Sequence, residues 1–115
     1  MKNIETQYRS LIKELLDAPF KSDRTGTGTY SLFGKTLEHN YHLLKNLLLF
    51  KNLEVPILAG VSRKSMLFKP LDISPKEALN ATTSANTIAL LNGANILRVH
   101  DVKEAMQAIK VVELL

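Results

Sequence analysis

Hydrophobic residues recur with helical spacing in two stretches of the first half of the chain. In residues 4–16 they return every three or four positions, which predicts an amphipathic helix that ends before Pro19. Residues 36–51 repeat this pattern. Between the two stretches, residues 21–29 are rich in glycine and threonine and predict a loop, and residues 29–33 predict a short strand.

The second half of the chain alternates short apolar runs with helical patterns. Residues 55–61 and 96–100 are short apolar runs, and the first is nearly continuous, as in a parallel strand buried on both faces. Residues 75–92 follow a clear helix start, with Ser74 as cap, proline at the first helical position and a glutamate that completes a capping box. A last helix follows Asp101, which we expect to cap it.

Residues 36–115 therefore predict the order helix, strand, helix, strand, helix. Strands that alternate with helices form βαβ units, in which the strands are parallel. The predicted fold class is α/β, with parallel βαβ units preceded by an N-terminal helix and a short strand.

The composition is that of one soluble globular domain. The chain has 115 residues, of which 45% are hydrophobic and 23% charged. It contains no cysteine, which excludes disulfides and thiol chemistry and fits a reducing cytoplasm. The N-terminus does not resemble a signal peptide, and the longest apolar run, residues 47–50, is too short to cross a bilayer. We expect a cytoplasmic protein without membrane contact.

The net charge of +4 raises the question of an anionic partner. The 15 lysines and arginines are thinly spread and tryptophan is absent, so a nucleic-acid partner is disfavoured. A solvated basic surface and a local pocket for a small anion both remain open.

Polar residues follow both predicted strands of the second half. Functional groups of parallel βα folds gather beyond the carboxyl ends of their strands. Arg98 and His100 are two residues apart, so strand alternation places them on one side, where they could meet Lys64 around one anion. Ser65 could add a hydroxyl and a backbone N–H near a helix start.

Two simpler interpretations compete with this pocket. Residues 62–65 could form a solvated loop. Alternatively, Arg98 could pair with Asp101 while His100 caps the last helix. Because both polar segments follow consecutive strands, we favour the pocket.

Three segments of the chain resemble one enzyme family. Residues 60–66 and 93–102 are similar, in order and spacing, to the closing motifs of dihydropteroate synthases, and residues 33–40 resemble the segment before the sixth barrel helix of that family. The resemblance covers about residues 33–115 and indicates that residues 35–115 are the C-terminal βα units of a TIM-type (βα) barrel.

The resemblance implies a function and a set of site residues. The family joins p-aminobenzoate to dihydropterin pyrophosphate with the help of Mg²⁺, for which no protein ligand can be assigned in this chain. The implied contacts are, for the pterin, Lys64 and Arg98; for p-aminobenzoate, Ser65, Ser62 and Phe33; and for the leaving phosphates, His100 and Arg98.

Residues 1–34 resemble a different family. Residues 21–29, followed by 30–34, are similar to the N-terminus of a thymidylate synthase, in which the arginine matching Arg24 binds the nucleotide phosphate. Without cysteine, the thymidylate synthase reaction is excluded. The two resemblances meet at residues 33–34, where residues 29–32 replace an acidic segment of the synthase, so the chain is expected to be a chimera or a fragment.

The expected origin of the chain as a chimera or a fragment limits the function that we expect from it. Because much of the expected pterin site is missing, we expect little synthase activity from this chain alone. A non-catalytic anion- or pterin-binding module and an inactive thymidylate synthase-related fragment are the alternatives. Two parallel strands cannot close a barrel, so apolar surface should remain open and favour a homo-oligomer.

Overall fold

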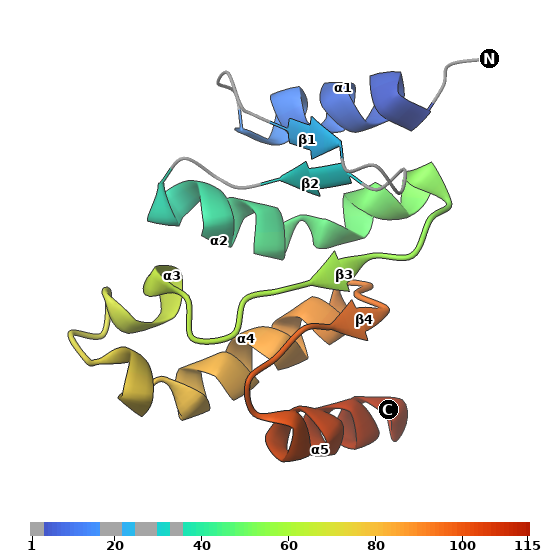
Figure 1. The fold of residues 1–115 in the computed structure, drawn as a ribbon. Coiled ribbons are helices and arrows are strands. Elements are labelled where there is room, and N and C mark those ends of the chain that lie inside the picture. Colours follow the sequence, from blue (N-terminus) through green and yellow to red (C-terminus); the bar gives the residue numbers. More distant parts are fainter. Residues whose placement is uncertain (1–3, 17–21, 25–29, 33–35) are drawn as a thin grey trace.

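The computed structural model describes residues 4–16, 22–24, 30–32 and 36–115 (Figure 1). The first part of the chain consists of helix α1 and an antiparallel hairpin of two strands, in which Asp23 lies opposite Ser31. The elements of this part are α1 (Ile4–Leu16), β1 (Ser22–Arg24) and β2 (Tyr30–Leu32). Helix α1 lies against α2 (Leu37–Lys45) and the 3₁₀ helix η1 (Leu47–Leu53).

The N-terminal part confirms two predicted elements and corrects one. Helix α1 has the predicted bounds, and β2 lies within the predicted strand 29–33. The loop prediction for residues 21–29 is wrong for Ser22–Arg24, which pair with β2. Partner strands supply the hydrogen bonds that make such a segment a strand, and loop-like composition does not reveal them.

The predicted helix 36–51 is divided into α2 and η1. Thr36 caps α2, since its Oγ1 accepts the backbone N–H of His39 at 3.1 Å. The helix ends at Asn46, whose Nδ2 donates to the carbonyl of His42 at 2.9 Å. This bond from side chain to backbone competes with continuation of the helix. After η1, the left-handed backbone of Glu54, with φ of 56°, turns the chain towards the sheet.

The C-terminal part contains the predicted parallel pair of strands. β3 (Leu58–Ala59) and β4 (Ile96–Leu97) are parallel, with Leu58 opposite Ile96 and Ala59 opposite Leu97. Both strands are shorter than their apolar runs. The four-residue helix α3 (Ser65–Phe68) was not predicted.

Two longer helices follow as predicted, although the α-helix of the first begins four residues later than expected. A 3₁₀ turn, η2 (Pro75–Glu77), leads into α4 (Leu79–Leu91), and α5 (Val102–Glu113) ends the fold. The capping box of Ser74 and Glu77 is present, with the backbone N–H of Ser74 donating to Glu77 Oε1 at 3.0 Å. Within the described ranges, no helix is long and apolar enough to cross a membrane.

The core lies on one side of the β3–β4 sheet. Ala59 is buried there in a cluster with Met66 and Leu67 of α3 and with Ala85 and Ala89 of α4. The alanines add little bulk, so the segments that carry them can pack closely in this cluster. One pair of opposing residues in the sheet, Leu58 and Ile96, is not part of this cluster.

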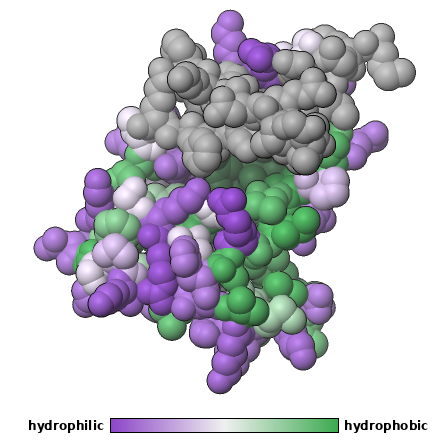
Figure 2. Space-filling view, viewed as in Figure 1, coloured by the Kyte–Doolittle hydropathy of each residue, from purple (hydrophilic) through white to green (hydrophobic). Residues whose placement is uncertain are grey.

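Leu58 and Ile96 face away from this core. They are 52% and 50% exposed, although they lie opposite each other in the sheet. Figure 2 shows hydrophobic surface over the β3–β4 side of the molecule. The predicted open apolar surface is therefore present.

Candidate anion-binding site

A small cavity of about 190 Å³ opens at the carboxyl ends of β3 and β4. The residues that line it are Gly60, Ser62, Lys64, Arg98, Val99 and His100. The structure thus brings together four of the residues that the sequence singled out, from segments that are more than thirty positions apart in the chain. None of these lining residues carries a carboxylate.

Two cationic side chains lie close together at this cavity. The pKa of the Lys64 ammonium is lowered from its ordinary value, mainly because the side chain is partly buried and also because the Arg98 guanidinium is nearby. Gly60 makes room for Arg98, since a Cβ at Gly60 would lie 2.9 Å from Arg98 Nη2. An anion in the cavity would offset the repulsion between the two cations.

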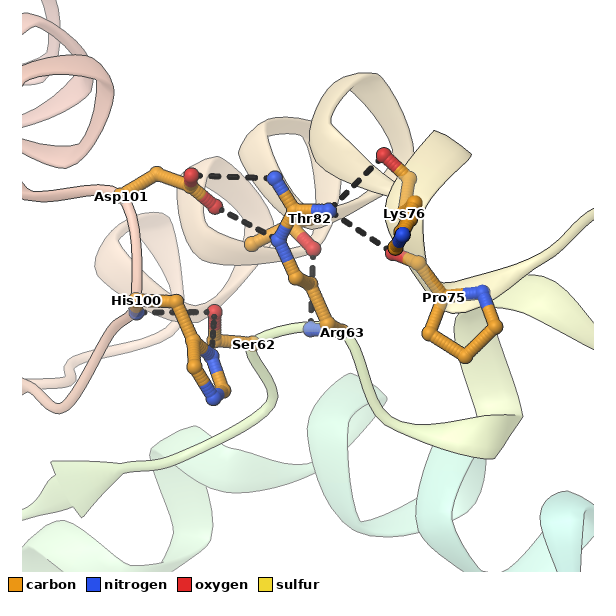
Figure 3. Close-up of polar contacts among 7 residues, drawn as sticks. All are labelled: Ser62, Arg63, Pro75, Lys76, Thr82, His100 and Asp101. Atoms are coloured by element: carbon orange, nitrogen blue, oxygen red, sulfur yellow. Dashed lines mark hydrogen bonds and ion pairs between the residues drawn. The ribbon is translucent and has the colours of Figure 1, made fainter.

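Ser62 and His100 form a close contact within the lining. Ser62 is buried, and its Oγ lies 2.8 Å from Nδ1 of His100. The same Oγ accepts the backbone N–H of His100 at 3.1 Å (Figure 3). Both the ring and the backbone of His100 are therefore held by one hydroxyl.

Arg63, the next residue, connects four segments around the cavity. Its Nε and Nη2 donate to the two carboxylate oxygens of Asp101, both at 3.0 Å (Figure 3). Nη1 donates to the carbonyls of Pro75 and Lys76 at 2.8 and 2.9 Å. Its backbone N–H donates to Thr82 Oγ1 at 3.0 Å. The guanidinium holds the pKa of the Asp101 carboxyl below its usual value.

These contacts overturn two of the sequence-based interpretations. The possible pair of Arg98 with Asp101 is wrong, because Asp101 pairs with Arg63. Asp101 occupies the N-cap position of α5, but its carboxylate makes no cap hydrogen bond there. The bidentate contact with a guanidinium is stronger than a single cap bond, which explains the choice.

The remaining site predictions have different outcomes. Ser65 begins α3 and is not among the residues that line the cavity. Arg24 belongs to β1, and Phe33 lies outside the described residues, so their roles stay predictions. Sequence reasoning gave Arg63 no role of its own. The available signal was that Ser62 and Arg63 follow one strand while His100 and Asp101 follow the next.

The described residues that line the cavity do not include the ligands that Mg²⁺ prefers. Mg²⁺ prefers carboxylate and phosphate oxygens. The described lining offers cations, a hydroxyl and an imidazole, and the nearby Asp101 carboxylate is engaged by Arg63. Among the described residues, no three His, Asp or Glu side chains cluster in a way that could hold a metal ion.

Residues 1–100 match the family described as "Pterin binding enzyme". This match covers most of the chain, which therefore belongs to that family.

Known proteins similar to this chain are dihydropteroate synthases. The enzyme of Escherichia coli (strain K12) is 48% identical over 81 residues, which cover 70% of this chain and 29% of that protein. The crystal structure of 7,8-dihydropteroate synthase from Vibrio fischeri ES114 has a TM-score of 0.71 and 37% identity, and the match covers 98% of this chain and 43% of that one. A Yersinia pestis dihydropteroate synthase in a sulfonamide drug complex has a TM-score of 0.71 at 32% identity, and the match covers 96% of this chain and 40% of that one. The chain thus spans less than half the length of each.

Proposed function

We propose that this chain is part of a dihydropteroate synthase, which condenses p-aminobenzoate with dihydropterin pyrophosphate in folate biosynthesis. The observation that carries the proposal is the cavity at which Lys64, Arg98 and His100 meet. Cationic and N–H donors at a leaving pyrophosphate stabilise the charge that develops as its C–O bond breaks. The names of the relatives support the same reaction.

Each site residue has a proposed role. Lys64 holds the pterin, Arg98 lies against the pterin ring, and His100 donates to the leaving phosphates. Ser62, Ser65 and Phe33 are proposed to line the p-aminobenzoate position. No role here depends on Mg²⁺, because the residues that line the cavity carry no carboxylate. A cytoplasmic location remains part of the proposal.

Isothermal titration with pyrophosphate, a pterin and an RNA oligomer tests the site. Pyrophosphate and the pterin should bind, and RNA should not. Lys64→Ala should weaken both interactions, whereas Lys110→Ala, which removes an exposed lysine of α5, should leave them unchanged. Equal binding by all three proteins would refute the assignment of the cavity.

A synthase assay separates an enzyme from a non-catalytic binding module. We expect no product from this chain alone, because catalysis by positioning requires both substrates to be held at near-attack distance. Product formation that disappears in Lys64→Ala would instead show that the chain is active by itself.

We also propose that β3, β4 and their helices are part of a TIM-type barrel. The half-exposed Leu58 and Ile96 occupy the sheet face that further barrel strands would cover. In this chain, a second copy is proposed to cover it, which would give a homo-oligomer. Light scattering at micromolar concentration should show more than a 12.9 kDa monomer, and Leu58→Ser should shift the population towards the monomer.

The thymidylate synthase-like character of residues 1–34 is a separate proposal. The Escherichia coli match covers 70% of the chain, which leaves room for a different origin of the N-terminus, although the family match begins at residue 1. If Arg24 keeps the phosphate role of that family, a nucleoside monophosphate should bind and Arg24→Ala should abolish the binding. No binding to the unaltered chain would exclude this role.

A further inference from the structure

Two adjacent residues of one loop hold two adjacent residues of another. Ser62 contacts His100, and Arg63 contacts Asp101, so the loops after β3 and β4 are joined at two consecutive positions (Figure 3). We call these four residues the loop clasp. Two of them, Ser62 and His100, also line the cavity.

We propose that the loop clasp is a positioning device for anion binding, in which Ser62 sets the tautomer of His100 so that its Nε2–H is presented to the ligand. Ser62 then also acts on the phosphate side of the site, in addition to lining the proposed p-aminobenzoate position. The proposal rests on the proposed function only in taking an anion as the ligand of the cavity.

The hydrogen bonds of Ser62 favour one tautomer of the His100 ring. Its Oγ already accepts the backbone N–H of His100 at 3.1 Å. If Nδ1 also carried a proton, the hydroxyl would accept twice, and its own hydrogen would have no acceptor that the described residues show. When the hydroxyl instead donates to Nδ1 across 2.8 Å, the neutral ring carries its proton on Nε2.

Arg63 fixes the clasp relative to the rest of the fold. Its backbone has a φ of 53°, a left-handed conformation that is uncommon for a residue with a side chain. The contacts to Asp101, to the carbonyls of Pro75 and Lys76 and to Thr82 hold it there. The start of α4 and the loop before α5 are thereby tied to the loop that carries Ser62 and Lys64.

Nitrogen-15 NMR of the imidazole rings tests the tautomer directly. At about pH 8.5, where imidazoles are normally neutral, the His100 ring of the unaltered protein should be mainly in the Nε2–H form. His100→Gln identifies its signals against those of the other two histidines. Mainly Nδ1–H in the unaltered protein would overturn the proposal, and this measurement depends neither on ligand binding nor on the folding of a Ser62 variant.

Serine variants test whether Ser62 acts through His100. Ser62→Ala should give a mixture of tautomers and weaken pyrophosphate binding by about 3- to 10-fold, the equivalent of one hydrogen bond. Ser62→Thr, which keeps the hydroxyl, should restore both. Ser84→Ala, which removes a serine hydroxyl of α4 that does not line the cavity, should change neither. An unchanged tautomer in Ser62→Ala would refute the role of Ser62.

Asp101→Asn tests the second contact of the clasp. It should weaken pyrophosphate binding about 3- to 10-fold although Asp101 does not line the cavity, whereas Glu104→Gln on α5 should not. Unchanged affinity in Asp101→Asn would limit the device to Ser62 and refute the clasp as a unit. If the unaltered chain binds no pyrophosphate, the proposed function fails, and the NMR result still decides the role of Ser62.

Discussion

The carboxyl edge and the open face of the β3–β4 sheet differ in how far contacts within this chain satisfy their side chains. At the carboxyl edge, Ser62, Arg63, His100 and Asp101 find partners in one another. On the open face, the register pair Leu58 and Ile96 remains half exposed. Loops that adjoin neighbouring strands can satisfy each other's polar groups locally, whereas burial of a sheet face requires another layer.

The packed face supplies the largest expected effect. Met66 is 2% exposed, so Met66→Ala should lower the free energy of unfolding by about 2–4 kcal/mol through lost burial and a cavity. Leu58→Ala, on the open face, should cost less than about 1 kcal/mol in the monomer. Urea unfolding at low protein concentration measures both, and similar losses would remove the contrast between the faces.

At the polar edge, the largest effect should come from Arg98. Arg98→Ala should weaken phosphate or pyrophosphate binding by about 1.5–3 kcal/mol, the range of hydrogen bonds to charged groups. Arg9→Ala replaces an exposed arginine of α1 and serves as the matched control. Calorimetric titration that finds the same affinity in Arg98→Ala as in the unaltered chain would contradict the cavity assignment.

Proton uptake should accompany anion binding at Lys64. Burial and Arg98 lower its pKa below the ordinary 10.5, and a bound anion favours the charged form. Between the lowered pKa and 10.5, binding should therefore take up protons, which titration in buffers of different ionisation enthalpy detects. In the same window the unfolded chain holds more protons than the folded one, so the stability of the free protein should rise with pH. Lys64→Ala should abolish both effects.

The smallest effect concerns the acid stability of the loop clasp. Because Arg63 lowers the pKa of Asp101, this carboxylate stabilises the fold above its ordinary pKa of 3.8, and the contribution is lost as the pH falls through the lowered value. Asp101→Asn should melt at a lower temperature than the unaltered chain at neutral pH, and the difference should shrink on acidification. A difference independent of pH would mean that the charge of Asp101 does not matter.

Prediction from the sequence succeeded where the signal was local. The bounds of α1, the capping box before α4 and the parallel strands follow from residue spacing within one segment or from the alternation of elements. β1 was missed because its strand character depends on pairing with β2. The end of α2 was missed because the bond of Asn46 to His42 is one of several that an asparagine could form.

The sequence by itself determined the family resemblance, the alternation of strands and helices, and the position of Ser62, Lys64, Arg98 and His100 after the two strands. Only the tertiary structure decided that Asp101 pairs with Arg63 and that one hydroxyl holds His100 at two atoms. The physical reason is that strand spacing specifies where a side chain starts. Its partner is decided by which donors and acceptors lie within about 3 Å once loops distant in the chain are packed together.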